Sequence, residues 1–113
     1  MRPESPELDG AVSRFALTKT FQGDLLGTGA GVMLSAGDPS AGYVAMEVVE
    51  GALRGRSGRF AMQQYGTAAS GTQTLHYEVV PGSASGGLTG LTGAIRLTVD
   101  DDGAHSYELE YDL

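Results

Sequence analysis

Three glycines spaced two residues apart, Gly27, Gly29 and Gly31, constrain most strongly how this chain can fold. They lie in "GDLLGTGAGVML", and the apolar residues around them are typical of a strand. A dinucleotide-binding loop would need its third glycine where Val32 stands, followed by a helix, and the sequence has neither feature. In a strand these glycines share one face, and a face without Cβ atoms lets a sheet bend sharply or another backbone come close. The spacing therefore predicts an extended strand over 23–36 and argues against a phosphate-binding loop.

The rest of the chain also consists of segments in which apolar and polar residues alternate, as they do in strands. In the last segment Tyr107, Leu109, Tyr111 and Leu113 fall on one parity. No segment keeps helical periodicity over three turns, and 83–93 has room for one short helical turn at most. Besides 23–36, the expected strands lie within 11–21, 42–50, 58–67, 71–82, 92–103 and 105–113.

Turn sequences join two pairs of these segments. "GALRGRSG" (51–58) supplies three glycines, and "DDDGA" (100–104) separates the last two segments, so both pairs are expected to form antiparallel hairpins. Short links between about seven to eight strands are typical of a small antiparallel β-barrel, because closure of the sheet removes unpaired edges. The sequence therefore predicts an all-β fold, a closed or nearly closed barrel with one parity of each strand inside.

Length and charge limit the classes of function. The 113 residues give one domain, with a loose lead-in at 1–11 and a barrel domain over 12–113. A net charge of −7 argues against binding to nucleic acid, and the only basic cluster, Arg54, Arg56 and Arg59, is expected to be a solvated surface. No apolar run approaches the roughly 20 residues that cross a membrane, and no signal-like segment is recognised. A cytoplasmic location is expected, with no membrane partner.

Several phrases together resemble a known family. They are "GRSGRF" (55–60), "VVPGS" (79–83), "GLTGLTG" (87–93) and the closing "HSYELEYDL" (105–113). They are similar to a bacterial family of uncharacterised small domains with an allene oxide cyclase-like barrel, over most of the chain. The resemblance implies a calycin-type β-barrel related to allene oxide cyclase and dirigent proteins. It brings no established reaction.

The chain departs from that family at its beginning. Family members usually start with an extra strand ahead of residue 12, whereas only eleven residues precede it here. Either the barrel lacks its first strand or "ESPELDG" stands in for it. A missing strand would expose an edge that a partner subunit could cover, so closure and monomeric state are both left open and a homo-oligomer is one outcome.

Polar residues on an apolar face are the candidates for a ligand-binding site. Glu47 lies between Ala45 and Val49 at two-residue spacing, where it is either a buried acid–base group or a solvent-facing strand residue, and the resemblance favours the interior. Gln63 and Tyr65 share a parity on the following strand and are expected beside Glu47. The register is not fixed by sequence, however, so Gln64 is the alternative to Gln63. Tyr43 completes the set of candidate ligand-binding residues. The alternative for Gln63 and Tyr65 is that they lie on a polar outer face.

Other reactive residues show no catalytic or metal-binding pattern. His76 alternates with polar residues, and His105 starts the last strand, so neither histidine is assigned a catalytic role. Asp100 to Asp102 lack the length and the glutamate of a calcium loop. No cysteine is present, and no serine lies in a nucleophile elbow. The sequence names no catalytic residue, no metal site and no cofactor.

Three functions follow from this reading. The first is an uncharacterised β-barrel protein that binds a small hydrophobic molecule in its lumen. The second is a cyclase or isomerase that acts on such a molecule in the same lumen, with Glu47 or a tyrosine giving acid–base help. The third is a structural or interaction module with a filled barrel. A cavity of several hundred Å³ separates the first two from the third.

Overall fold

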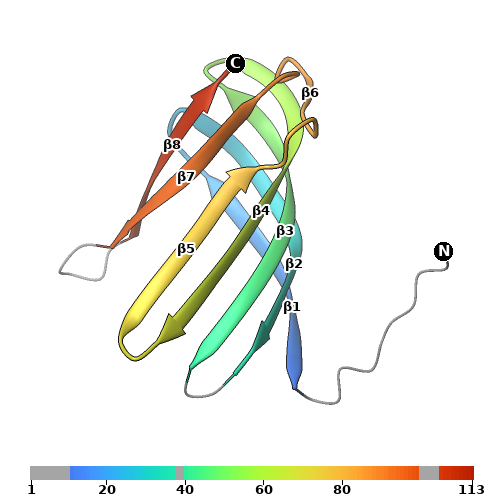
Figure 1. Cartoon of the computed structure of the whole chain (residues 1–113). Coiled ribbons are helices and arrows are strands. Elements are labelled where there is room, and N and C mark those ends of the chain that lie inside the picture. The colour runs from blue at the N-terminus through green and yellow to red at the C-terminus, as the bar shows by residue number, and fades with distance from the viewer. Residues whose placement is uncertain (1–10, 38–39, 100–104) are drawn as a thin grey trace, which may run out of the picture.

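The computed structural model describes residues 11–37, 40–99 and 105–113, and its strands form a single antiparallel sheet (Figure 1). The segments expected from the sequence are all strands, and a short strand at 85–86 takes the place of a helical turn. The lead-in over 1–10, including all of "ESPELDG", and the acidic turn at 100–104 lie outside the described residues. The strands are β1 (Val12–Phe21), β2 (Leu25–Ala36), β3 (Ala41–Leu53), β4 (Arg56–Ala69), β5 (Thr72–Val79), β6 (Ser85–Gly86), β7 (Thr92–Val99) and β8 (His105–Asp112).

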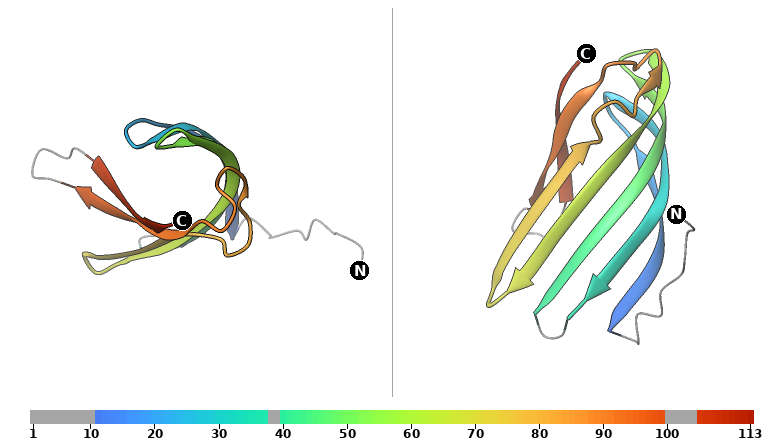
Figure 2. Two further views of the ribbon diagram at one scale, coloured as in Figure 1. Left: turned by 90° about the horizontal axis from the view of Figure 1, so that it is seen from above. Right: turned by 45° about the vertical axis from the view of Figure 1, so that its right-hand side comes forward.

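The sheet is strongly curled but not closed by hydrogen bonds. Its strand order is β1-β2-β3-β4-β5-β7-β8, with β6 paired to β4. In the view from above, the strands curve around a common interior (Figure 2). Two seams remain among the described residues: β1 and β8 are not paired with each other, and β5 meets β7 through the single pair Glu78 and Ala94. The expected all-β antiparallel barrel is thus confirmed in its nearly closed form.

Two tight hairpins set the register of the central strands. Arg54 and Gly55 link β3 to β4 with φ angles of 50° and 82°, and Ser70 and Gly71 link β4 to β5 with 51° and 79°. Positive φ at both central residues is the geometry of a type I′ turn, whose twist matches that of the flanking strands. The first turn is therefore much shorter than the expected 51–58. A two-residue loop pairs odd positions of β3 with even positions of β4, so Glu47 lies opposite Met62.

The glycines of β2 allow its close approach to β3. Gly27, Gly29 and Gly31 share one face of β2 as predicted, and this face is the inner one. Gly23 precedes the strand in a turn with a φ of +112°. A Cβ atom at Gly31 would overlap the backbone carbonyl oxygen of Met46 and lie 2.6 Å from the Cα of Glu47. Real Cβ atoms do not come this close to backbone, so glycine at position 31 permits the tight curl beside β3.

The hydrophobic core fills the end of the barrel nearest the β3–β4 hairpin. Its fully buried members come from β3, β4 and the segment that follows β6. The largest are Leu53, Phe60, Met62, Leu88 and Leu91. Side chains of β7 and β8, such as Ile95, Leu109 and Tyr111, pack against the same cluster. The opposite end of the interior, near the β4–β5 hairpin, is the part left for a site.

The described part of the chain contains no helix long and apolar enough to cross a membrane.

Candidate functional site

Three polar side chains from three strands meet inside the sheet: Lys19 of β1, Glu47 of β3 and Tyr77 of β5. We call them the inner cluster. The carboxylate oxygen Oε1 of Glu47 accepts a hydrogen bond from the Tyr77 hydroxyl. Lys19 Nζ lies 3.4 Å from the same oxygen, 2.9 Å from the Tyr77 hydroxyl and 4.6 Å from the centre of the Tyr77 ring. Because Glu47 is only 2% exposed, this carboxylate depends on its protein partners for solvation.

The environment keeps the Tyr77 phenol protonated. Burial, together with the hydrogen bond to Glu47 and the negative charge of that residue, raises the pKa of Tyr77 well above its ordinary value of about 10. The phenol is therefore a hydrogen-bond donor at physiological pH. Lys19 supplies the positive charge, and its side chain is about a quarter exposed, so the cluster has one edge towards solvent.

One oxygen of the inner cluster is left without a partner. Oε2 of Glu47 is buried and finds no hydrogen-bond partner among the described residues. It lies against Gly29, where an added Cβ would be 3.2 Å from this oxygen and 3.3 Å from the Phe21 ring. Buried polar atoms are normally paired, so an unpaired carboxylate oxygen is a place where a donor from a water or a ligand can bind.

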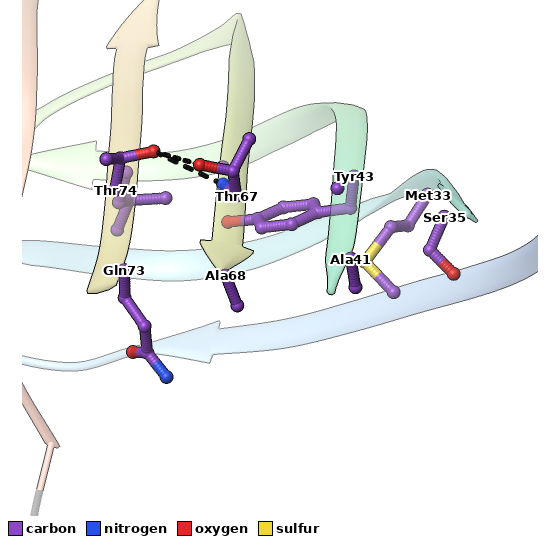
Figure 3. Close-up of a pocket in the computed structure, with 11 residues that line it drawn as sticks. Met33, Ser35, Ala41, Tyr43, Thr67, Ala68, Gln73 and Thr74 are labelled. Atoms are coloured by element: carbon purple, nitrogen blue, oxygen red, sulfur yellow. Dashed lines mark hydrogen bonds between the residues drawn. The ribbon is translucent and has the colours of Figure 1, made fainter. Parts of the chain in front are cut away.

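A cavity of about 490 Å³ occupies the end of the interior that the core leaves open (Figure 3). Tyr43, Met33 and Leu75 form part of its apolar wall, and Gln73 lies at its rim. Thr67 and Thr74 also line it, and their hydroxyls pair on the outer face of the sheet, 2.8 Å apart. Its full lining is Met33, Ser35, Ala41, Gly42, Tyr43, Gly66, Thr67, Ala68, Gln73, Thr74 and Leu75. The volume lies within the range of small-molecule sites.

A second cavity, of about 470 Å³, lies at the seam between β5 and β7. Tyr77 of the inner cluster lines it, together with Ile95 and the ion pair of Arg96 and Glu110, whose atoms are 3.1 Å apart. Leu75 lines both cavities. Leu75 and then Tyr77 therefore follow one another along β5 from the open end of the barrel to the inner cluster.

The structure turns two of the four candidate residues inward, at different places along β3. Glu47 faces the interior, and Tyr43 faces the first cavity, where its hydroxyl donates to Gln64 Oε1 at 3.0 Å. Burial raises the pKa of Tyr43, so it also stays protonated.

The expected placement of Gln63 and Tyr65 beside Glu47 is wrong. The two-residue turn pairs Glu47 with Met62, and Gln63 and Tyr65 therefore face outward. Gln63 donates to Glu78 on the outer face, 2.9 Å away, and the Tyr65 ring stacks on His76 with 4.6 Å between ring centres. Gln64, the alternative left open by the register, is the inward residue.

Sequence reasoning missed Lys19 and Tyr77. Tyr77 shares a parity with Leu75 and Val79, but nothing in the sequence showed that a phenol two strands away would reach Glu47. Lys19 lies on the same parity as Leu17 and Phe21, where a lysine among inward residues was the available signal. Within the described residues, no three histidine, aspartate or glutamate side chains gather in a way that could hold a metal ion.

These features define a class of protein, a curled antiparallel β-sheet with a buried carboxylate–phenol–ammonium cluster beside an open cavity. The chain belongs to DUF3224, a family of proteins of unknown function, whose model matches residues 2–111. It is similar to a crystallised DUF3224 protein of unknown function from Shewanella oneidensis MR-1. The two are 42% identical, with a TM-score of 0.81, over 99% of this chain and 86% of that chain. No curated protein matches the chain. The expected membership of an uncharacterised family is confirmed.

Proposed function

We propose that this protein binds a small, largely hydrophobic molecule in the interior of an allene oxide cyclase-like, calycin-type barrel. The molecule enters at the open end near the β4–β5 hairpin and extends along β5 towards the inner cluster. The observation that carries the proposal is the combination of the 490 Å³ cavity with the buried Glu47, whose oxygen Oε2 is unpaired among the described residues. The proposal also keeps the cytoplasmic location expected from the sequence.

The geometry suggests a ligand with one polar end. The cavity wall near Met33, Tyr43 and Leu75 is mainly apolar and suits a hydrophobic body. Tyr43 and Glu47 are four residues apart on β3, so their Cα atoms are about 14 Å apart along the strand. A hydroxyl or amine at the far end of a medium-length molecule would span this distance and donate to Oε2. The exposed edge of Lys19 offers a charge partner to a ligand with an anionic end.

A fluorescent apolar probe, 1-anilinonaphthalene-8-sulfonate, tests the binding function. Ala68 lines the cavity, so Ala68→Phe fills part of it and is expected to weaken probe binding at least tenfold. Ala69 is the next residue on β4 and is exposed outside the cavity lining, which makes Ala69→Phe the matched control with unchanged binding. Equal probe affinity in the wild type and both variants would contradict binding in this cavity.

A reaction in the same interior is the alternative. The hydrogen bond from Tyr77 to Glu47 favours it, because the protonated phenol can deliver a proton and the carboxylate can accept one in an isomerisation or cyclisation. Once a bound molecule and its conversion are identified, Glu47→Gln separates the two functions. Turnover that survives this change unaltered would exclude an acid–base role for Glu47.

The third candidate function, a structural module with a filled barrel, agrees with only one end of the interior. The core fills the interior near Leu53 and Phe60, whereas the end near Tyr43 holds the cavity. The predicted criterion of several hundred Å³ is met, so the ligand-binding functions are the better supported.

A further inference from the structure

Large apolar side chains gather on the outer face of β2, β3 and β4, away from the interior. Val32 lies opposite Met46, and Val44 lies between Leu34 and Tyr65 in the sheet register. Apart from Leu34, which is partly buried, these side chains are between about a third and a half exposed. We call this surface the outer patch, which comprises Val32, Leu34, Val44, Met46, Val48 and Tyr65.

The outer patch is hollowed as well as apolar. A shallow cavity of about 480 Å³ lies over Leu34, Val44 and Tyr65. A second one, of about 280 Å³, continues over Met46 and towards Glu78. Isolated exposed apolar residues are ordinary on a protein surface, but a contiguous, grooved group of them marks an interaction site.

Charged residues flank the outer patch on opposite sides and with opposite signs. Arg14 of β1 lies next to Leu34, in the same row of the sheet as Val44 and Tyr65. Glu78 of β5 lies beside Gln63 at the other side. Both charged residues are exposed, and no charged residue lies among the six members of the patch.

We propose that the outer patch joins two copies of this chain in a homodimer whose two-fold axis runs along β3. This rotation stacks the two patches and exchanges the β1 side of one copy with the β5 side of the other. Arg14 of each copy then faces β5 of its partner, one row from Glu78, so two ion pairs form at the rim. Interfaces related by a two-fold axis require such self-complementarity.

Charge and size both fit a second copy as the occupant. Each chain carries a net charge of −7, so two copies repel each other unless they meet through an uncharged face with paired rim charges. From β1 to β5 the face spans about 20 Å at the usual strand spacing, and the three rows of side chains that hold the patch cover about 20 Å along the strands. This footprint lies below the roughly 800 Å² per partner of a standard interface and fits a dimer that dissociates at low concentration.

Sedimentation velocity over a range of protein concentrations tests the dimer. The wild type is expected to shift from monomer to dimer as its concentration rises. Met46→Glu places a charge at the centre of the patch and is expected to raise the dissociation constant at least tenfold. Leu26→Glu, at an exposed position on the same face of β2 but outside the patch, is the matched control and leaves the dissociation constant unchanged. Circular dichroism melting establishes that each variant is folded.

A charge exchange tests the direction of the axis. Arg14→Glu and Glu78→Arg are each expected to weaken the dimer, and the double variant is expected to restore it, because the ion pair re-forms with its signs reversed. A wild type that stays monomeric at every concentration would overturn the proposal. So would a Met46→Glu variant that dimerises like the wild type, or a double variant that is no stronger than the single ones.

Discussion

The hydroxyl of Tyr77 on β5 donates a hydrogen bond to the carboxylate of Glu47 on β3, although β4 lies between these strands. In a flat sheet, side chains on strands that are not adjacent would lie too far apart for this contact. The curl of the sheet brings the two side chains together over Met62, which pairs with both Glu47 and Val79. The inner cluster is therefore a consequence of the curvature that the glycines of β2 permit.

Removing the Tyr77 hydroxyl is expected to destabilise the fold. Tyr77→Phe leaves Oε1 of the buried Glu47 with Lys19 alone, and an under-satisfied buried polar group costs about 1–3 kcal/mol. Urea denaturation measures this as a loss in the free energy of unfolding. Tyr65→Phe removes a hydroxyl from an exposed ring on the outer face and serves as the control, with a change within about 0.5 kcal/mol. Equal effects of the two substitutions would show that the inner cluster contributes nothing to stability.

The raised pKa of Tyr77 predicts a loss of stability at alkaline pH. The unfolded chain releases the Tyr77 proton at about pH 10, whereas the folded chain holds it to higher pH. The unfolded state then binds fewer protons, so the free energy of unfolding falls as the pH rises above about 10. Tyr77→Phe is expected to make this fall shallower, and the raised pKa of Tyr43 leaves a remainder. Urea denaturation at a series of alkaline pH values gives the slope, and an unchanged slope in the variant would refute the assignment.

A side chain at position 31 is expected to destabilise the fold. Gly31→Ala forces a Cβ against the backbone of Met46 and Glu47 and is expected to destabilise the protein by about 1–3 kcal/mol. Gly42 on β3 offers the matched control, since the closest atom to its added Cβ is 3.7 Å away. Gly42→Ala is therefore expected to change the melting temperature little. A well-tolerated Gly31→Ala would contradict the steric explanation of the glycines in β2.

The ion pair inside the cluster is expected to matter more than one on the surface. Lys19→Met removes the positive partner of a carboxylate that is almost fully buried, and about 1–3 kcal/mol of stability is expected to be lost. Arg96→Met breaks the exposed pair with Glu110 and is expected to cost less than about 1 kcal/mol. Differential scanning calorimetry compares the two variants. The reverse order of stability would show that Glu47 does not depend on Lys19.

Much of the fold could be predicted because most strands carry a period-two pattern on one face only. Leu75, Tyr77 and Val79 are inward residues, and their alternation with polar neighbours is plain in the sequence. β2 and β3 are exceptions, since their outer faces carry Val32 and Leu34 on β2 and Val44 and Met46 on β3 and are also apolar. Alternation alone therefore could not decide which way Glu47 faces.

The site was harder to predict because it depends on register and curvature. The two-residue turn at Arg54 and Gly55 turns Gln64 inward instead of Gln63, and the turn sequence offered several glycines at which the chain could reverse. The contact between Tyr77 and Glu47 joins β5 to β3 across β4, and pairing rules for adjacent strands cannot predict such a contact. Lys19 joins them only because β1 curls over the interior.

Native mass spectrometry of protein purified directly from its host, without denaturation, tests the ligand-binding proposal most directly. The wild type is expected to carry a bound small molecule, seen as a discrete mass above that of the chain. Ala68→Phe is expected to lose it, and Ala69→Phe is expected to retain it. Wild-type protein that shows only the mass of the bare chain and binds no apolar probe would contradict the proposed function.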